Sequence, residues 1–374
     1  DGGTIKLDGN YPVGTGNVAL GNTAGDSIAS GGNYNSLIGA NAGTAITTGT
    51  YNVALGASSL TTASTGTHNT AIGADALGLL TTASSNTAIG SGALVLTTTG
   101  ANNVSVGRNA LRNNTTANSN TAVGLNAQYS STTATNNTML GMQAGYTTTT
   151  GSNSVGIGKS ALYYNTTGGS NVAVGNSALL NNTTASDNTA VGYNALNANN
   201  TGARNTAIGS ASLTANTSGQ NNVSVGYNSM LANTSGSENI SIGVGTLDSN
   251  TTGSNNIALG RSALATSTTT SNLVAVGYQA LNKNTTGGSG VAIGYNALEE
   301  NTTGSGNTAV GRQALQENTT AGNNTAVGYL ALDANSTGAN NVSIGKGSLS
   351  ANTTASNNSA LGFHALFSNT TGTA

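Results

Sequence analysis

The sequence has no cysteine, no tryptophan, a single proline and few charged residues, which make up 5% of its 374 residues. Without cysteine, neither disulfide bonds nor thiolate metal sites can hold the structure. A net charge of −2 gives no electrostatic attraction to nucleic acid or to an anionic membrane surface. Because no run of about 18 apolar residues occurs, we expect no membrane insertion within this segment.

Groups that carry catalysis are also scarce and scattered. The two histidines, His68 and His364, are too far apart in the chain to share a site. The closest carboxylate pair is Glu299 and Glu300, which we interpret as part of a solvated turn. The glycines match no phosphate-binding loop in context, and no metal-ligand cluster is present. The sequence therefore predicts no enzyme activity, no cofactor site and no metal site.

What the sequence does contain is one short unit, repeated along nearly its whole length. Asn188 to Gly192 reads Asn-Thr-Ala-Val-Gly, and 21 close copies of this unit occur. Their closing glycines are 17 residues apart from Gly39 to Gly362, after one interval of 18 residues that begins at Gly21. A period this short and regular is typical of a solenoid, in which one repeat cannot bury its apolar face alone. A disordered chain would not keep this register.

Each coil can be numbered from its fixed glycine, so that Gly192 is position 1 and Ile208 is position 17. Position 17 is Val, Ile or Leu in all 21 copies, and position 15 is Thr, Val, Ile or Ser. Position 16, between them, is nearly always Ala or Ser. This alternation predicts a strand over positions 14 to 17, followed by a turn at the glycine.

A second apolar point follows at positions 4 and 5, as in Ala195-Leu196. Two apolar points per coil, separated by turns, indicate an all-β fold: a parallel β-solenoid, or β-roll, of about 21 coils. Position 5 is Leu or Met in 17 of 21 copies, and the exceptions are Gly25, Gly43, Gln128 and Gly145. We interpret residues 1–16 as an atypical lead-in or capping coil. Residues 17–374 form the continuous array, which ends partway through a repeat.

Asparagine occupies position 14 in 18 of the 21 copies, with exceptions only at Ser154, Leu273 and Gly290. Stacked coils place equivalent residues about 4.8 Å apart. Asn side chains at that spacing can hydrogen-bond from coil to coil, so we predict a structural Asn ladder. The recurrent Asn-Thr-Thr units, such as Asn284 to Thr286, also match the acceptor sequence for N-glycosylation.

The strand is apolar on both faces, although one roll has only one interior. In one interpretation, positions 15 and 17 face the interior and small residues at position 16 pack against another copy of the chain. In the alternative, position 16 lines a thin interior and positions 15 and 17 pack outward. Both interpretations predict a homo-oligomer. The third alternative is a monomeric roll whose Ala-rich outer face is exposed to solvent.

The unit Asn-Thr-Ala-Val-Gly followed by Ala-Leu, as in Asn188 to Leu196 and Asn307 to Leu315, resembles the head repeats of trimeric autotransporter adhesins. It is also similar to repeat arrays in fibre proteins of bacteriophages and bacteria. The resemblance covers residues 17–374, although adhesin head repeats are a few residues shorter. It implies left-handed parallel β-rolls, joined as an intertwined or side-by-side homotrimer that forms a surface fibre for attachment.

Position 2 is the variable column that carries the most side-chain chemistry. Five of the nine basic residues lie in it, interleaved with aromatic residues. We call its later members the position-2 stripe: Tyr193, Tyr227, Arg261, Tyr278, Tyr295, Arg312, Tyr329, Lys346 and Phe363. Such a stripe could contact a host-surface glycan or protein, or its members could simply stack on one another between coils.

These observations predict a structural and adhesive fibre segment, located outside the cell on a cell surface or a virion tail fibre. The chain itself is the first expected partner. The alternative is a subunit of a self-assembling extracellular filament with a purely structural role. Ice binding ranks third, because the adjacent threonines of pairs such as Thr285-Thr286 would point to opposite faces.

Overall fold

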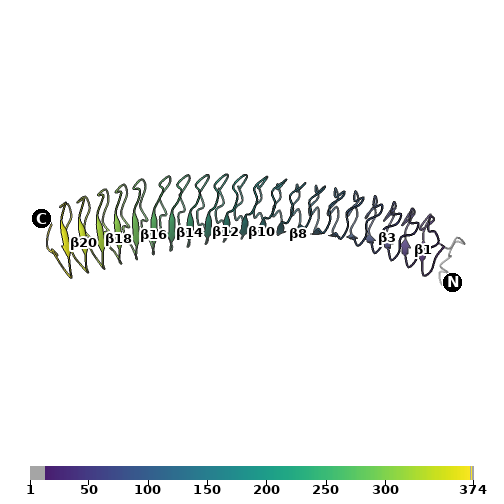
Figure 1. Cartoon of the computed structure of the whole chain (residues 1–374), viewed down its shortest axis with the longest axis horizontal. Helices are drawn as coiled ribbons and strands as arrows, with labels where there is room; N and C mark the ends of the chain where they lie inside the picture. Colours follow the sequence, from purple (N-terminus) through teal and green to yellow (C-terminus); the bar gives the residue numbers. More distant parts are fainter. Residues whose placement is uncertain (1–12, 371, 373–374) are drawn as a thin grey trace, which may run out of the picture. The chain divides into compact units, whose positions relative to one another are not determined.

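The computed structural model describes residues 13–370 and residue 372. No helix occurs among these residues, and each coil contributes one strand of three residues. The chain divides into two compact units, one up to Ser186 and one from Asp187 onward. Figure 1 shows the coils of each unit as short strand arrows in sequence order. Most of the expected lead-in at residues 1–16 lies outside the described residues.

The first unit contains strands β1 to β10. They are β1 (Val18–Leu20), β2 (Ser36–Ile38), β3 (Val53–Leu55), β4 (Thr70–Ile72), β5 (Thr87–Ile89), β6 (Val104–Val106), β7 (Thr121–Val123), β8 (Thr138–Leu140), β9 (Val155–Ile157) and β10 (Val172–Val174). The second unit contains strands β11 to β21. They are β11 (Thr189–Val191), β12 (Thr206–Ile208), β13 (Val223–Val225), β14 (Ile240–Ile242), β15 (Ile257–Leu259), β16 (Val274–Val276), β17 (Val291–Ile293), β18 (Thr308–Val310), β19 (Thr325–Val327), β20 (Val342–Ile344) and β21 (Ser359–Leu361).

Within each unit, every strand pairs in parallel with the strand of the next coil. In β11 and β12, for example, Ala190 lies opposite Ala207, one period away. The same register holds from β1 to β10 and from β11 to β21. The predicted parallel β-solenoid with 17-residue coils is therefore confirmed, although each strand begins at position 15 instead of 14.

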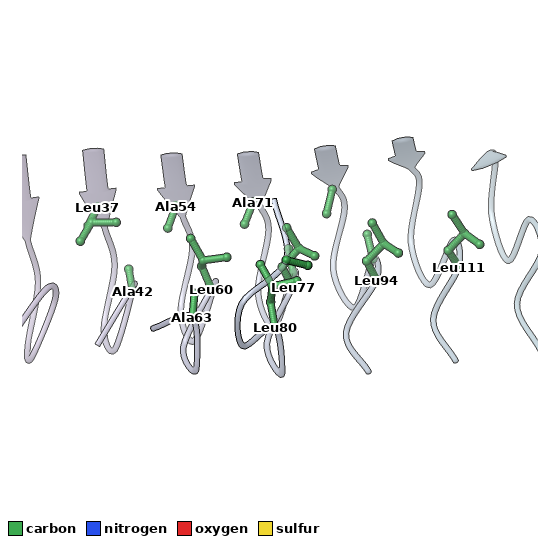
Figure 2. Close-up of a cluster of buried hydrophobic side chains, with 14 of the residues drawn as sticks. Leu37, Ala42, Ala54, Leu60, Ala63, Ala71, Leu77, Leu80, Leu94 and Leu111 are labelled. Carbon is green, nitrogen blue, oxygen red and sulfur yellow. The ribbon is translucent and has the colours of Figure 1, made fainter. Parts of the chain in front are cut away.

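The middle residue of each strand faces the interior, and its two neighbours face outward. Ala190 and Ala207 are fully buried, whereas Ile208 is 41% exposed. In the first unit, Ala54 and Ala71 point from their strands into the coil interior (Figure 2). The interpretation that placed positions 15 and 17 inside is therefore wrong, and position 16 lines a thin interior, as the alternative predicts. Small residues predominate at position 16 because the coil is thin.

Leucine at position 5 fills the interior from the other side of the coil. Leu196 and Leu213 are fully buried, which stabilises the fold by about 1.5–3 kcal/mol for each side chain. Both residues have a left-handed backbone, with φ of 52° and 53°. A β-branched residue is a genuine outlier in that conformation. Hence position 5 holds Leu, Met, Gly or Gln in all copies, and never Val or Ile.

The fixed glycine turns the chain directly after the strand. Gly192 has φ of 137°, and a Cβ added to it would lie 2.5 Å from the carbonyl oxygen of Gly209 in the next coil. No side chain fits in that space, because real Cβ atoms do not approach backbone atoms so closely. This glycine therefore allows successive turns to stack at the strand spacing.

The predicted Asn ladder at position 14 is present and is anchored to the backbone. Asn222 donates hydrogen bonds from Nδ2 to Oδ1 of Asn205 at 3.1 Å and to the carbonyl oxygen of Gly236 at 2.9 Å. Its backbone N–H donates to the same Asn205 Oδ1 at 3.0 Å. Each buried amide thus joins three coils, which satisfies polar groups that would otherwise be costly to bury.

A second Asn ladder, at position 8, was not anticipated. Asn216 Nδ2 donates to Asn199 Oδ1 at 2.8 Å and to the carbonyl oxygen of Gly219 at 3.0 Å. The ladder is interrupted where Ser267 replaces Asn, and the Oδ1 atom of Asn250, in the preceding coil, has no hydrogen-bond partner. Asparagine at position 8 therefore acts as a buried link between coils instead of a simple loop residue.

The irregular coils show that interior volume is exchanged between positions. Met139 takes the place of the small residue at position 16, and Gly145 takes the place of Leu at position 5. A Cβ at Gly145 would lie 2.8 Å from Met139 Sδ, so the methionine occupies the missing leucine's volume. Leu37 and Gly43 make the same exchange, with a corresponding distance of 2.8 Å to Leu37 Cδ2.

Candidate recognition surface

The structure brings together six members of the position-2 stripe, all of them in the second unit. The rings of Tyr278 and Tyr295 stack with centroids 5.2 Å apart and planes 10° apart. Arg312 then lies between two rings, with Cζ 5.5 Å from the Tyr295 centroid and 5.7 Å from that of Tyr329. Lys346 continues the series, with Nζ 5.8 Å from the Tyr329 centroid and 5.7 Å from that of Phe363.

This run is a ladder of rings and cations in which successive members contact one another from coil to coil. The contacts fall within the ranges for aromatic stacking and cation–π attraction. Because the faces of Tyr295 and Tyr329 are used within the ladder, their edges and hydroxyl groups are what face solvent. Any ligand of this part of the stripe would meet those edges and the cationic groups.

The remaining members, Tyr193, Tyr227 and Arg261, take part in no ring stacking or cation–π contact among the described residues. Tyr193 and Tyr227 are 58% and 57% exposed, whereas the stacked Tyr278 is 39% exposed. The additional exposure follows from the sequence, because Ser210 separates Tyr193 from Tyr227 in the column. These two rings therefore present faces as well as edges to solvent.

Next to the stripe lies the outward face of the sheet, which is apolar over long stretches. In β14, Ile240 and Ile242 are 38% and 43% exposed. Equivalent residues in nearby coils, Ile257 in β15 and Ile208 in β12, are 37% and 41% exposed. An apolar strip of this kind, rimmed by polar turns, is a feature of surfaces that associate with other proteins.

Two further aromatic ladders occur in the first unit, at other columns. Tyr34, Tyr51 and His68 stack at position 13, with both centroid distances 5.0 Å. Another stack, at position 6, has centroid distances of 5.2 Å and 5.0 Å and consists of Tyr129, Tyr146 and Tyr163. Our sequence interpretation missed both. The signal was available, because the members of each ladder recur at the 17-residue period.

The two adjacent carboxylates, Glu299 and Glu300, have different partners. Glu300 forms an ion pair with Lys283, with Oε1 2.6 Å from Nζ, and this hydrogen bond raises the pKa of the lysine. Glu299 Oε2 instead accepts a hydrogen bond from Gln316 Nε2 at 2.9 Å. Burial raises the pKa of the Asp248 carboxyl, whose Oδ1 atom has no hydrogen-bond partner.

Within the described residues, no group of three or more His, Cys, Asp or Glu side chains is placed to hold a metal ion. Nor does that part of the chain contain a helix with the length and apolar character needed to cross a membrane. Comparison with known proteins adds no assignment, because no family model and no curated protein matches this chain.

Proposed function

We propose that this chain is a structural and adhesive fibre segment that acts outside the cell, on a cell surface or a virion tail fibre. The main support for this proposal is the outward apolar face of the repeated strands, as at Ile240 and Ile242. A parallel sheet that is apolar on both faces is normally covered on both. One chain covers only the inner face, so the outer face favours association with further copies.

The preferred assembly is a homotrimer of left-handed rolls. Its support is the resemblance of the Asn-Thr-Ala-Val-Gly repeats to adhesin heads and fibre arrays. In this proposal the sheet faces of three copies cover one another, and the position-2 stripe beside them forms an attachment surface for a glycan or protein. The absence of cysteine suits a fibre that must tolerate any redox state.

Two measurements test this proposal. Sedimentation velocity on the purified chain should show a stable homotrimer, and a folded monomer at micromolar concentration would contradict the assembly. Adhesion of coated beads to host cells should weaken when Tyr278, Tyr295 and Tyr329 are all replaced by alanine. Unchanged adhesion by the folded triple variant would show that these three tyrosines do not bind the host surface. Polymerisation without any adhesion would instead favour a purely structural filament.

A further inference from the structure

Beyond a general attachment surface, the structure contains a ring-sized gap at one place in the position-2 stripe. Tyr193, Ser210 and Tyr227 follow strands β11, β12 and β13, which pair in register. Figure 1 labels β12, the middle strand of the three. The three side chains thus occupy equivalent places in successive coils, and the middle one is too short to fill its level of the stack.

The width of the gap follows from the coil spacing. Equivalent residues in adjacent coils are about 4.8 Å apart. The adjacent Tyr278 and Tyr295 rings of the same column stack at 5.2 Å. Tyr193 and Tyr227 are two coils apart, so their rings are separated by about 10 Å. One further ring, placed midway, would lie about 5 Å from each tyrosine, which is an ordinary stacking distance.

The exposed fractions agree with an open gap. Tyr193 and Tyr227 are 58% and 57% exposed, whereas Tyr295 and Tyr329, which have a neighbour on each ring face, are 47% and 39% exposed. The side chain of Ser210 is half-buried and supplies a hydroxyl group at the floor. The site therefore offers two flat apolar walls, a hydroxyl floor and phenol hydroxyl groups at the rim.

We infer that this gap, the Tyr193–Tyr227 slot, binds one pyranose ring of a saccharide. A pyranose has C–H groups on both faces and hydroxyl groups around its edge. Its faces match the two tyrosine walls, and its edge matches the hydroxyl groups of Ser210 and the tyrosines. The chemistry is uncharged throughout, which accords with a chain of net charge −2. This inference rests on the proposed recognition function, because it names the ligand class of the same stripe.

The test uses saturation-transfer NMR on the intact chain, with methyl β-D-glucopyranoside and methyl β-D-galactopyranoside as probes. Sorbitol serves as the matched control, because it carries similar hydroxyl groups but no ring. We expect a transfer signal from at least one glycoside and none from sorbitol. Replacing either Tyr193 or Tyr227 with alanine should weaken glycoside binding about tenfold, because one wall is lost.

The decisive variant is Ser210→Tyr, which fills the slot with a third ring. The column already accepts tyrosine in adjacent coils at Tyr278 and Tyr295, so this variant should keep its circular dichroism spectrum and melting temperature. The glycoside signal should disappear in Ser210→Tyr and persist in Tyr164→Ala, which removes an exposed tyrosine outside the stripe. A signal that survives Ser210→Tyr, or no signal from either glycoside, would overturn the inference. Phenol is tested as a further probe. A signal from phenol but from neither glycoside would show that the slot binds an aromatic ligand and not a saccharide.

Bead adhesion and sedimentation, measured on the same Ser210→Tyr protein, separate this inference from the proposed function. If the variant and the parent chain both form trimers and adhere while neither binds glycosides, the slot inference fails and the fibre proposal stands. If the parent chain binds glycosides through the slot but remains monomeric and does not adhere, the fibre proposal fails and the slot stands.

Discussion

At the scale of single residues, backbone conformation selects the side chain as strongly as hydrophobicity does. Leu196 is buried at a φ of 52°, and Met230 occupies the equivalent place at 50°. An aliphatic residue with a branched Cβ would satisfy the burial but not the backbone. This explains why a column that looks merely apolar excludes two of the commonest apolar residues in the chain.

We therefore predict that Leu196→Val destabilises the chain by about 1–3 kcal/mol, from backbone strain and lost packing. The matched control is Leu196→Met, which keeps an unbranched Cβ and should cost less than about 1.5 kcal/mol. Urea denaturation followed by circular dichroism measures both variants. Equal stability of the two would show that the left-handed backbone does not select the residue.

Burial also decides whether the Asn-Thr-Thr units can carry sugar. Asn284 is fully buried, its Nδ2 donates to the carbonyl oxygen of Gly287 at 2.9 Å, and its Oδ1 accepts from Asn301 Nδ2 at 2.8 Å. A glycan on Nδ2 would disturb both the hydrogen bond within the coil to Gly287 and the coil-to-coil link to Asn301. In a host that glycosylates Asn-X-Thr, we predict that folded chains carry no glycan at Asn284. Peptide mapping of the folded fraction checks this, and an occupied Asn284 there would contradict it.

At the scale of one coil, positions 5 and 16 share a fixed interior volume. Gly145→Leu should therefore destabilise by about 1–3 kcal/mol, because the new side chain meets Met139. Met139→Ala alone should cost about 2–5 kcal/mol, because it leaves a cavity. The double variant restores the usual alanine and leucine pair, so it should be close to the parent chain in stability. Additive losses in this double-mutant cycle would show that the two positions are independent.

Coil length, strand position and the position-14 ladder were all predictable, because each depends on a residue type repeated in register. Which residues of the strand face the interior was not predictable. Small residues at position 16 suit either a thin interior or a close intermolecular contact, and only the path of the turns decides between them. The volume exchange at Met139 and Gly145 was missed for a similar reason, since the two residues, six positions apart in the chain, meet only because the turn brings them to opposite sides of one interior.

For the stripe, sequence periodicity predicted which residues share a column but not which surfaces they expose. Tyr278 and Tyr193 belong to the same column, yet the first uses a ring face for stacking and the second takes part in no stacking contact. The difference arises from the neighbour one period away. The gap at Ser210 is visible in the order of residues along the column, but not in the list of residue types that the column contains.

At the scale of the whole molecule, the proposed homotrimer depends on an outward sheet face that carries Val, Ile or Leu at position 17 of every copy. Adjacent members of one outward column, Ile242 and Leu259, can be replaced by lysine and glutamate. Opposite charges in successive coils are tolerated in this chain, as the pair Lys283 and Glu300 shows at 2.6 Å. The pair Ile242→Lys and Leu259→Glu should therefore preserve the fold while making the outward face polar.

We predict that this double variant shifts the chain from trimer toward monomer in sedimentation velocity, since burying two charges in an interface is costly. The matched control places the same charges on the exposed turn at position 10, as Ser235→Lys with Thr252→Glu. The control should remain a trimer. If both variants keep the parent's oligomeric state and melting temperature, copies do not meet through the strand face. If only the strand-face variant dissociates, the apolar residues at position 17 serve assembly, and the stripe beside them is left free for recognition.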